Sequence, residues 1–144
     1  MLKNRIRFSS TILAALGFID SLYLTWVKIT ANPALCIKGL GDCVTVNSSK
    51  FSELFGIPIA ALGGLAYLVI LVCLLLENRY HFFSSYAPYA VFGLSLFGAV
   101  YSLYLTYVEF AVIKAICPYC LTSAVIILVI FILSIIRLVN DQDH

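Results

Sequence analysis

The stretch PIAALGGLAYLVILVCLLL, from Pro58 to Leu76, contains no charged residue and is almost entirely apolar. A helix that crosses a membrane needs about 20 consecutive, mostly apolar residues. Three further stretches fit this description, at about residues 8–27, 88–108 and 117–136. The sequence therefore predicts an all-α fold, a membrane four-helix bundle, built as a single domain over residues 1–144.

Composition supports a membrane protein and excludes other classes. Apolar residues make up 62% of the chain and charged residues 11%, whereas soluble domains have about 25% charged residues. The net charge of +2 is too small and too scattered to predict a nucleic-acid partner. The first apolar run contains Asp20 and is followed by no small-residue cleavage pattern, so we expect a retained helix and not a signal peptide.

The placement of basic residues predicts the orientation, because Lys and Arg accumulate on the cytoplasmic side of membrane proteins. A basic cluster precedes the first predicted helix, and two further arginines fall on the same side. These residues are Lys3, Arg5, Arg7, Arg79 and Arg137. We expect a multi-pass protein of the cell (inner or cytoplasmic) membrane with both termini in the cytoplasm. Loops 28–57 and 109–116 would then face the exterior, where disulfides persist.

An internal repeat links the two halves of the chain. The segment GFIDSLYLTWV at 17–27 resembles GAVYSLYLTYV at 98–108, and the core SLYLT is identical at an offset of 81 residues. The same offset carries Cys36 onto Cys117. This pattern indicates a parallel repeat in which each half delivers a cysteine to the outer face. Chance similarity between apolar helices is the alternative.

Four of the five cysteines form two pairs on the predicted outer side. Cys36 and Cys43 lie in the long loop, and Cys117 and Cys120 form a Cys-Pro-Tyr-Cys motif where the fourth helix begins. A helix N-terminus presents unpaired amides and a partial positive charge, which favour the nucleophilic thiolate. The pattern predicts two redox-active pairs. Cys73, within the second predicted helix, is interpreted as a small apolar packing residue.

Two other roles for the outer cysteines stay open on this pattern. They could form static structural disulfides, although the Cys117–Cys120 loop is too short to restrain the unfolded chain much. They could also bind zinc, in a non-enzymatic membrane module for metal binding or assembly. A channel or transporter is disfavoured because charges within the helices are scarce. Asp20 is expected to pair with a polar neighbour inside the bundle.

The segment Ser48–Phe55 is predicted to form a short interfacial helix that caps the redox site. Phe51, Leu54 and Phe55 recur at helical spacing, Ser48 or Ser49 can cap the helix, and Gly56 can end it. A linker that lies on the membrane surface is the alternative to a lid. The sequence contains no haem, flavin or metal motif, so a quinone dissolved in the bilayer is the electron acceptor left by elimination. Ser49 is a candidate partner for a quinone carbonyl, or only a helix cap.

The order of these motifs resembles the vitamin K epoxide reductase family, specifically its short bacterial or archaeal homologues. A cysteine pair in the first outer loop (Cys36, Cys43) is followed by Ser49, by Phe-Gly-Ile-Pro at 55–58, and by Cys117 and Cys120 opening the fourth helix. DsbB-type oxidases place their Cys-X-X-Cys in the first outer loop, which is the reverse arrangement. The resemblance covers nearly the whole chain.

The resemblance implies a quinone-dependent thiol oxidoreductase that supports disulfide bond formation. A reduced thioredoxin-fold (DsbA-like) partner would attack the Cys36–Cys43 disulfide and form a mixed disulfide with Cys43. Freed Cys36 would attack the Cys117–Cys120 disulfide, and Cys120 would reduce a quinone such as menaquinone or ubiquinone. Ser49 and Phe55, with Cys120, are expected to bind or support the quinone, and no metal is expected.

Two departures refine this expectation. Many bacterial relatives carry a fused thioredoxin-like domain, whereas this chain ends at His144, so we expect the partner to be a separate protein. Vertebrate members carry a Tyr four residues after the second cysteine of the fourth helix, where this chain has Ala124. We therefore expect a quinone, and not vitamin K epoxide, to be the oxidant.

Overall fold

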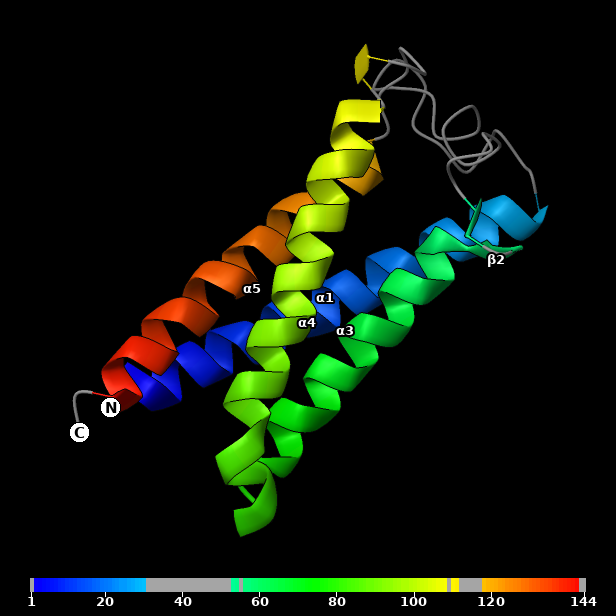
Figure 1. The fold of residues 1–144 in the computed structure, drawn as a ribbon. Coiled ribbons are helices and arrows are strands. Elements are labelled where there is room, and N and C mark those ends of the chain that lie inside the picture. Colours follow the sequence, from blue (N-terminus) through cyan, green and yellow to red (C-terminus); the bar gives the residue numbers. More distant parts are fainter. Residues whose placement is uncertain (1, 31–52, 55, 109, 112–117, 143–144) are drawn as a thin grey trace.

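The computed structural model describes residues 2–30, 53–54, 56–108, 110–111 and 118–142 (Figure 1). Within these ranges the elements follow the order α1 (Leu2–Thr30), β1 (Glu53–Leu54), β2 (Ile57–Pro58), α3 (Ile59–Leu76), α4 (His81–Val108) and α5 (Pro118–Gln142). The long helices cross one another as a bundle, with the start of α1 and the end of α5 close together at one end (Figure 1). The predicted all-α four-helix fold is confirmed.

Each of the four long described helices contains a segment that is long and apolar enough to cross a membrane, namely Asn4–Trp26, Ile59–Leu76, His81–Val108 and Tyr119–Asn140. The side chains that point out of the bundle are largely apolar. Leu65, Leu75, Phe97 and Val100 are each more than half exposed, which would be costly in water but is favourable among lipid tails. The chain is therefore a multi-pass membrane protein.

The helices pack through faces that carry small residues. On α1 the buried positions Ser10, Ala14, Gly17 and Ser21 follow one another at helical spacing. Small residues let helix backbones approach closely, and in a membrane such van der Waals packing replaces the hydrophobic effect as the main driving force. α1 packs chiefly on α3, with α5 as its second neighbour, while α4 packs on α5 and α3.

The two copies of the sequence repeat adopt matching local structures. A Cβ atom on Gly17 would overlap the ring of Tyr67, and one on Gly98 would lie 2.9 Å from Cγ1 of Ile127. Both glycines therefore mark a close approach to the next helix along the chain. In addition, the hydroxyls of Thr25 and Thr106 each donate a 2.8 Å hydrogen bond to the carbonyl four residues earlier.

A two-residue hairpin precedes α3. β1 and β2 pair antiparallel, with Glu53 opposite Pro58 and Leu54 opposite Ile57, and Gly56 makes the turn with a φ of 81°. This corrects the short helix predicted over Ser48–Phe55 at its two described residues, Glu53 and Leu54. Glycine adopts positive φ without steric cost, so Gly56 reverses the chain into a strand pair where the sequence pattern suggested a helix end.

Several helices are longer than the apolar runs that predicted them. α4 begins at His81, seven residues before the predicted start at Pro88, which lies buried inside the helix. Proline is common at the first position of a helix, where its missing amide hydrogen would be unpaired anyway. Inside α4 it removes the hydrogen bond to the carbonyl four residues earlier, and the remaining helix and its packing tolerate that loss.

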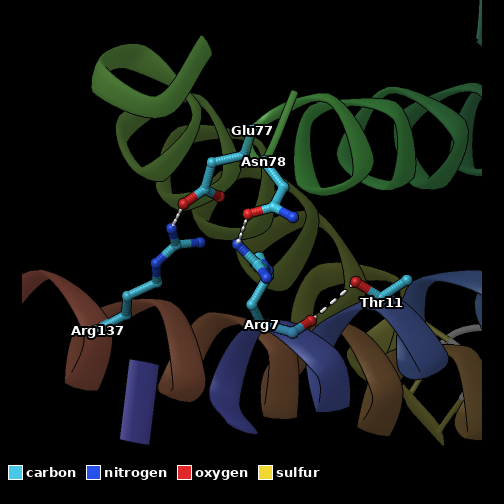
Figure 2. Close-up of polar contacts among 5 residues, drawn as sticks. All are labelled: Arg7, Thr11, Glu77, Asn78 and Arg137. Carbon is cyan, nitrogen blue, oxygen red and sulfur yellow. Dashed lines mark hydrogen bonds and ion pairs between the residues drawn. The ribbon is translucent and has the colours of Figure 1, made fainter. Parts of the chain in front are cut away.

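Charged side chains gather at the end of the bundle where α1 starts and α5 ends. The guanidinium of Arg137 on α5 pairs with the carboxylate of Glu77, just after α3, and both side chains are almost fully buried. Beside them Arg7 donates a 3.3 Å hydrogen bond from Nη1 to Oδ1 of Asn78, as Figure 2 shows. These contacts hold α1 and α5 against the turn that connects α3 to α4.

We expect Gly17→Ala to destabilise the bundle by about 1–3 kcal/mol, the usual cost of overpacking a well-packed site. The ring of Tyr67 is buried and hydrogen-bonded, so it has little room to move away from the new methyl group. The midpoint of thermal unfolding in detergent would measure the loss. Gly93→Ala on α4 is the matched control, because its Cβ would meet nothing within 4 Å and should leave the midpoint unchanged or raise it. Equal midpoints for the two variants would contradict the close-approach role of Gly17.

Removing one partner of the Glu77–Arg137 pair should be more harmful than removing both. Arg137→Met leaves the Glu77 carboxylate buried without this cation, for which we expect a loss of about 3–5 kcal/mol. The double variant Glu77→Met with Arg137→Met should lose less than Arg137→Met alone. A double-mutant cycle on unfolding in mixed detergent would measure this difference. Additive losses would show that the two side chains do not depend on each other.

Candidate functional site

Cys120 is the one residue of the four predicted redox cysteines that the described part of the chain includes. It is the third residue of α5, which begins at Pro118, and its side chain is half-buried. Pro118 suits the first helical position because its missing amide hydrogen would be unpaired there. The free amides of the first turn and the helix dipole favour the thiolate form of a cysteine in this position.

An aromatic pair joins the start of α5 to α1 beside Cys120. The rings of Tyr23 and Tyr119 have centroids 4.8 Å apart and are tilted by 48°, a favourable geometry for an aromatic pair. Tyr119 directly precedes Cys120 in the sequence. The contact therefore fixes the first turn of α5, and with it the backbone of Cys120, against the outer part of α1.

One helical turn further into the bundle, Tyr67 of α3 reaches α5. Its hydroxyl donates a 2.9 Å hydrogen bond to the carbonyl of Ser123 and lies 3.1 Å from the Ser123 hydroxyl. Ser123 follows Cys120 by three residues, so the two share a face of α5. The ring of Tyr67 packs against Gly17 of α1. A polar position thus lies below Cys120, between three helices.

Asp20 completes this polar cluster from α1. It lies one helical turn from Gly17 on the face of α1 that packs on α3, where the ring of Tyr67 meets Gly17. One carboxyl oxygen, Oδ2, is buried and has no hydrogen-bond partner among the described residues. The sequence predicted a polar neighbour for Asp20 without naming it, and Tyr67, whose ring packs against Gly17 one helical turn from Asp20, is the candidate that the structure offers. We refer to Asp20, Tyr67 and Ser123 as the polar cluster.

The other predicted site residues lie outside the described residues. They are Cys36, Cys43, Ser49, Phe55 and Cys117, and their proposed roles stay predictions. Cys73, predicted to be a packing residue, is half-buried on α3 and packs against the apolar core. Among the described residues no three His, Cys, Asp or Glu side chains gather as metal ligands would. The alternative zinc site concerns cysteines that mostly fall outside these ranges, so it is not tested by that observation.

A second polar region lies at the opposite end of the bundle. A cavity of about 460 Å³ is bordered by Arg7, Asn78, Arg79 and His81, among others, next to the Glu77–Arg137 pair (Figure 2). α5 runs 17 residues from Cys120 to Arg137, or roughly 25 Å at the rise of an α-helix. This cavity is therefore separate from the surroundings of Cys120.

Sequence reasoning missed Tyr67 and Ser123. Tyr67 stands out as the hydroxyl-bearing aromatic residue in an otherwise apolar helix, and Ser123 follows Cys120 at the spacing of one helical turn. Both features can be read from the sequence, but the contact between the two residues cannot. That contact depends on the rotation of α3 about its axis, which brings Tyr67 toward α5, and a single apolar run does not specify that rotation.

Comparison with known proteins agrees with the resemblance drawn from the motifs. The model of the vitamin K epoxide reductase family matches residues 9–135. A thiol-disulfide oxidoreductase, LTO1 of Arabidopsis thaliana, is 32% identical over 124 residues, covering 81% of this chain and 32% of that protein. The chain thus spans about a third of the length of this relative.

Proposed function

Because the chain belongs to the vitamin K epoxide reductase family, we propose that it is a quinone-dependent thiol-disulfide oxidoreductase. The observation that supports this most directly is Cys120 in the first turn of α5, where a helix N-terminus favours thiolate. The similarity to a plant protein named as a thiol-disulfide oxidoreductase supports the same class of chemistry. Residues 1–144 would act as one four-helix domain.

The proposed electron path starts at a reduced protein of the thioredoxin fold. A thiolate of that partner attacks the Cys36–Cys43 disulfide and forms a mixed disulfide with Cys43, which its second thiol resolves. Freed Cys36 attacks the Cys117–Cys120 disulfide, Cys43 completes the exchange, and the Cys36–Cys43 disulfide is restored. Each exchange moves two electrons and leaves two thiols where the disulfide was.

The last step returns the site to its oxidised form. The Cys117–Cys120 dithiol gives two electrons and two protons to a quinone, yielding a quinol and the disulfide. A quinone dissolved in the bilayer can reach α5 from the lipid side, since the outer faces of the helices are apolar. Menaquinone and ubiquinone both fit this description, and Ser49 and Phe55 are proposed to support the bound ring.

We propose that the cysteines face the exterior of the cell membrane and both termini face the cytoplasm. Arg7, Arg79 and Arg137 lie together at one end of the bundle, beside the turn after α3, while Cys120 lies at the other end of α5. Basic side chains collect on the cytoplasmic side, and disulfides persist on the exterior. One orientation therefore satisfies both requirements.

Trapping of a mixed disulfide tests this proposal. We expect Cys36→Ala to accumulate a covalent adduct with a thioredoxin-fold protein on non-reducing gels, because the Cys43 thiol can still form a disulfide with an oxidised partner and Cys36 is no longer present to displace the partner from Cys43. Cys43→Ala should show no adduct, since Cys43 is the proposed entry point. Cys73→Ala is the matched control and should behave as wild type, because Cys73 packs inside the bundle. Absence of an adduct with either outer variant, together with stoichiometric zinc in the purified protein, would replace the proposal with the metal-binding module.

A further inference from the structure

The polar cluster lies next to Cys120, inside the bundle, where a path that carries protons to and from this cysteine would begin. Ser123 lies one helical turn from Cys120 on the same face of α5, and its hydroxyl is 3.1 Å from that of Tyr67. The ring of Tyr67 packs against Gly17, and Asp20 follows Gly17 by one helical turn on the same face of α1. Two hydroxyls that can exchange protons thus lie between the redox cysteine and a carboxyl group inside the membrane-spanning part of α1.

Asp20 is an unusual residue for a purely structural role. A carboxyl group within a membrane span is costly and commonly marks a proton relay. The arginines of α1, Arg5 and Arg7, are almost four turns away along the helix, so they do not neutralise it. Its Oδ2 atom has no hydrogen-bond partner among the described residues. A group that only held the helices together would be expected to use both oxygens.

We propose that Asp20 holds a proton for the redox site and exchanges it with Cys120 through the hydroxyls of Ser123 and Tyr67. This inference rests on the proposed function and adds a proton path to it. Each hydroxyl accepts a proton on one side and releases one on the other, so both are unchanged at the end. The Tyr67 hydroxyl, which donates to the Ser123 carbonyl at rest, turns about its C–O bond to serve Asp20 directly or through one water.

The relay balances the chemistry of quinone reduction. The proton of the Cys120 thiol passes to the Asp20 carboxylate, which leaves Cys120 as the thiolate. The Cys120 thiolate and the Cys117 thiol then give two electrons and one proton to the quinone as their disulfide forms. The quinol anion takes the second proton from Asp20. In sum, one dithiol and one quinone become one disulfide and one quinol, and Asp20 returns to its starting form.

Steady-state reduction of ubiquinone-1 by dithiothreitol, with the full chain in detergent, tests the relay. Asp20→Asn keeps the size and the hydrogen-bonding capacity of the side chain but cannot hold the proton. We expect its kcat to fall on the order of 100-fold, a typical contribution of a positioned acid–base group, with an unchanged KM for the quinone. Asp20→Glu should recover much of the rate, and alkylation of the cysteines should show that thiol exchange stays as fast as in wild type.

Matched variants separate the relay from general damage. Tyr67→Phe and Ser123→Ala should lower kcat, whereas Tyr101→Phe on α4 and the buried Ser134→Ala on α5 should not, because they lie outside the polar cluster. Unfolding midpoints of all variants control for stability. If Asp20→Asn keeps the kcat of the wild-type protein, the relay is overturned while the proposed function stays intact. Equal losses in Asp20→Asn and Asp20→Glu would also overturn it, since they indicate a structural role. Failure of wild type to reduce ubiquinone-1 would overturn both proposals.

Discussion

The side chain of Tyr67 is the contact on which the arrangement of the bundle depends most. Its ring is buried against Gly17 of α1, and its hydroxyl is bonded to Ser123 of α5. This one residue of α3 therefore fixes the distance between α3 and α1 and the rotation of α5 about its axis. In a membrane the apolar effect does not distinguish a helix neighbour from a lipid tail, so close packing and internal hydrogen bonds must determine the arrangement. Without Gly17 the ring could not enter, and without the ring Ser123 would lose a partner.

The two ends of the bundle are chemically different, since one carries charged side chains and the other carries an aromatic pair beside Cys120. At one end the Glu77–Arg137 pair and the Arg7–Asn78 contact gather charge next to the turn after α3. At the other end Tyr23 packs on Tyr119, next to Cys120. Buried charge pairs add little net stability over apolar side chains, but they penalise alternatives in which one partner is left alone. The pair at Glu77 therefore acts against sliding or rotation of α5, which would move Cys120 away from the polar cluster.

The membrane-spanning helices could be predicted from the sequence because length and apolarity are local properties of a segment. Residues 58–76 could be read as a crossing helix from composition alone, and α3 covers Ile59–Leu76. Contacts between helices were out of reach, because the Glu77–Arg137 and Tyr67–Ser123 pairs depend on how each helix is rotated. The pattern at 48–55 was misleading at Glu53 and Leu54, where the positive φ of Gly56 produces a hairpin. The roles of Cys36, Cys43, Ser49, Phe55 and Cys117 fall outside the described residues and stay predictions.

The internal repeat separates the parts of α1 that build the scaffold from the part that carries chemistry. Gly17, Ser21 and Thr25 have equivalents in Gly98, Ser102 and Thr106, and the close approaches and threonine hydrogen bonds recur in both copies. At the position of Asp20 the second copy has Tyr101, whose ring stacks on Phe97 of its own helix. The same helix geometry is therefore obtained without a carboxyl group. Because the second copy obtains this geometry without a carboxyl group, the presence of Asp20 one helical turn from the Gly17–Tyr67 contact calls for a different explanation, and holding a proton near Cys120 provides one.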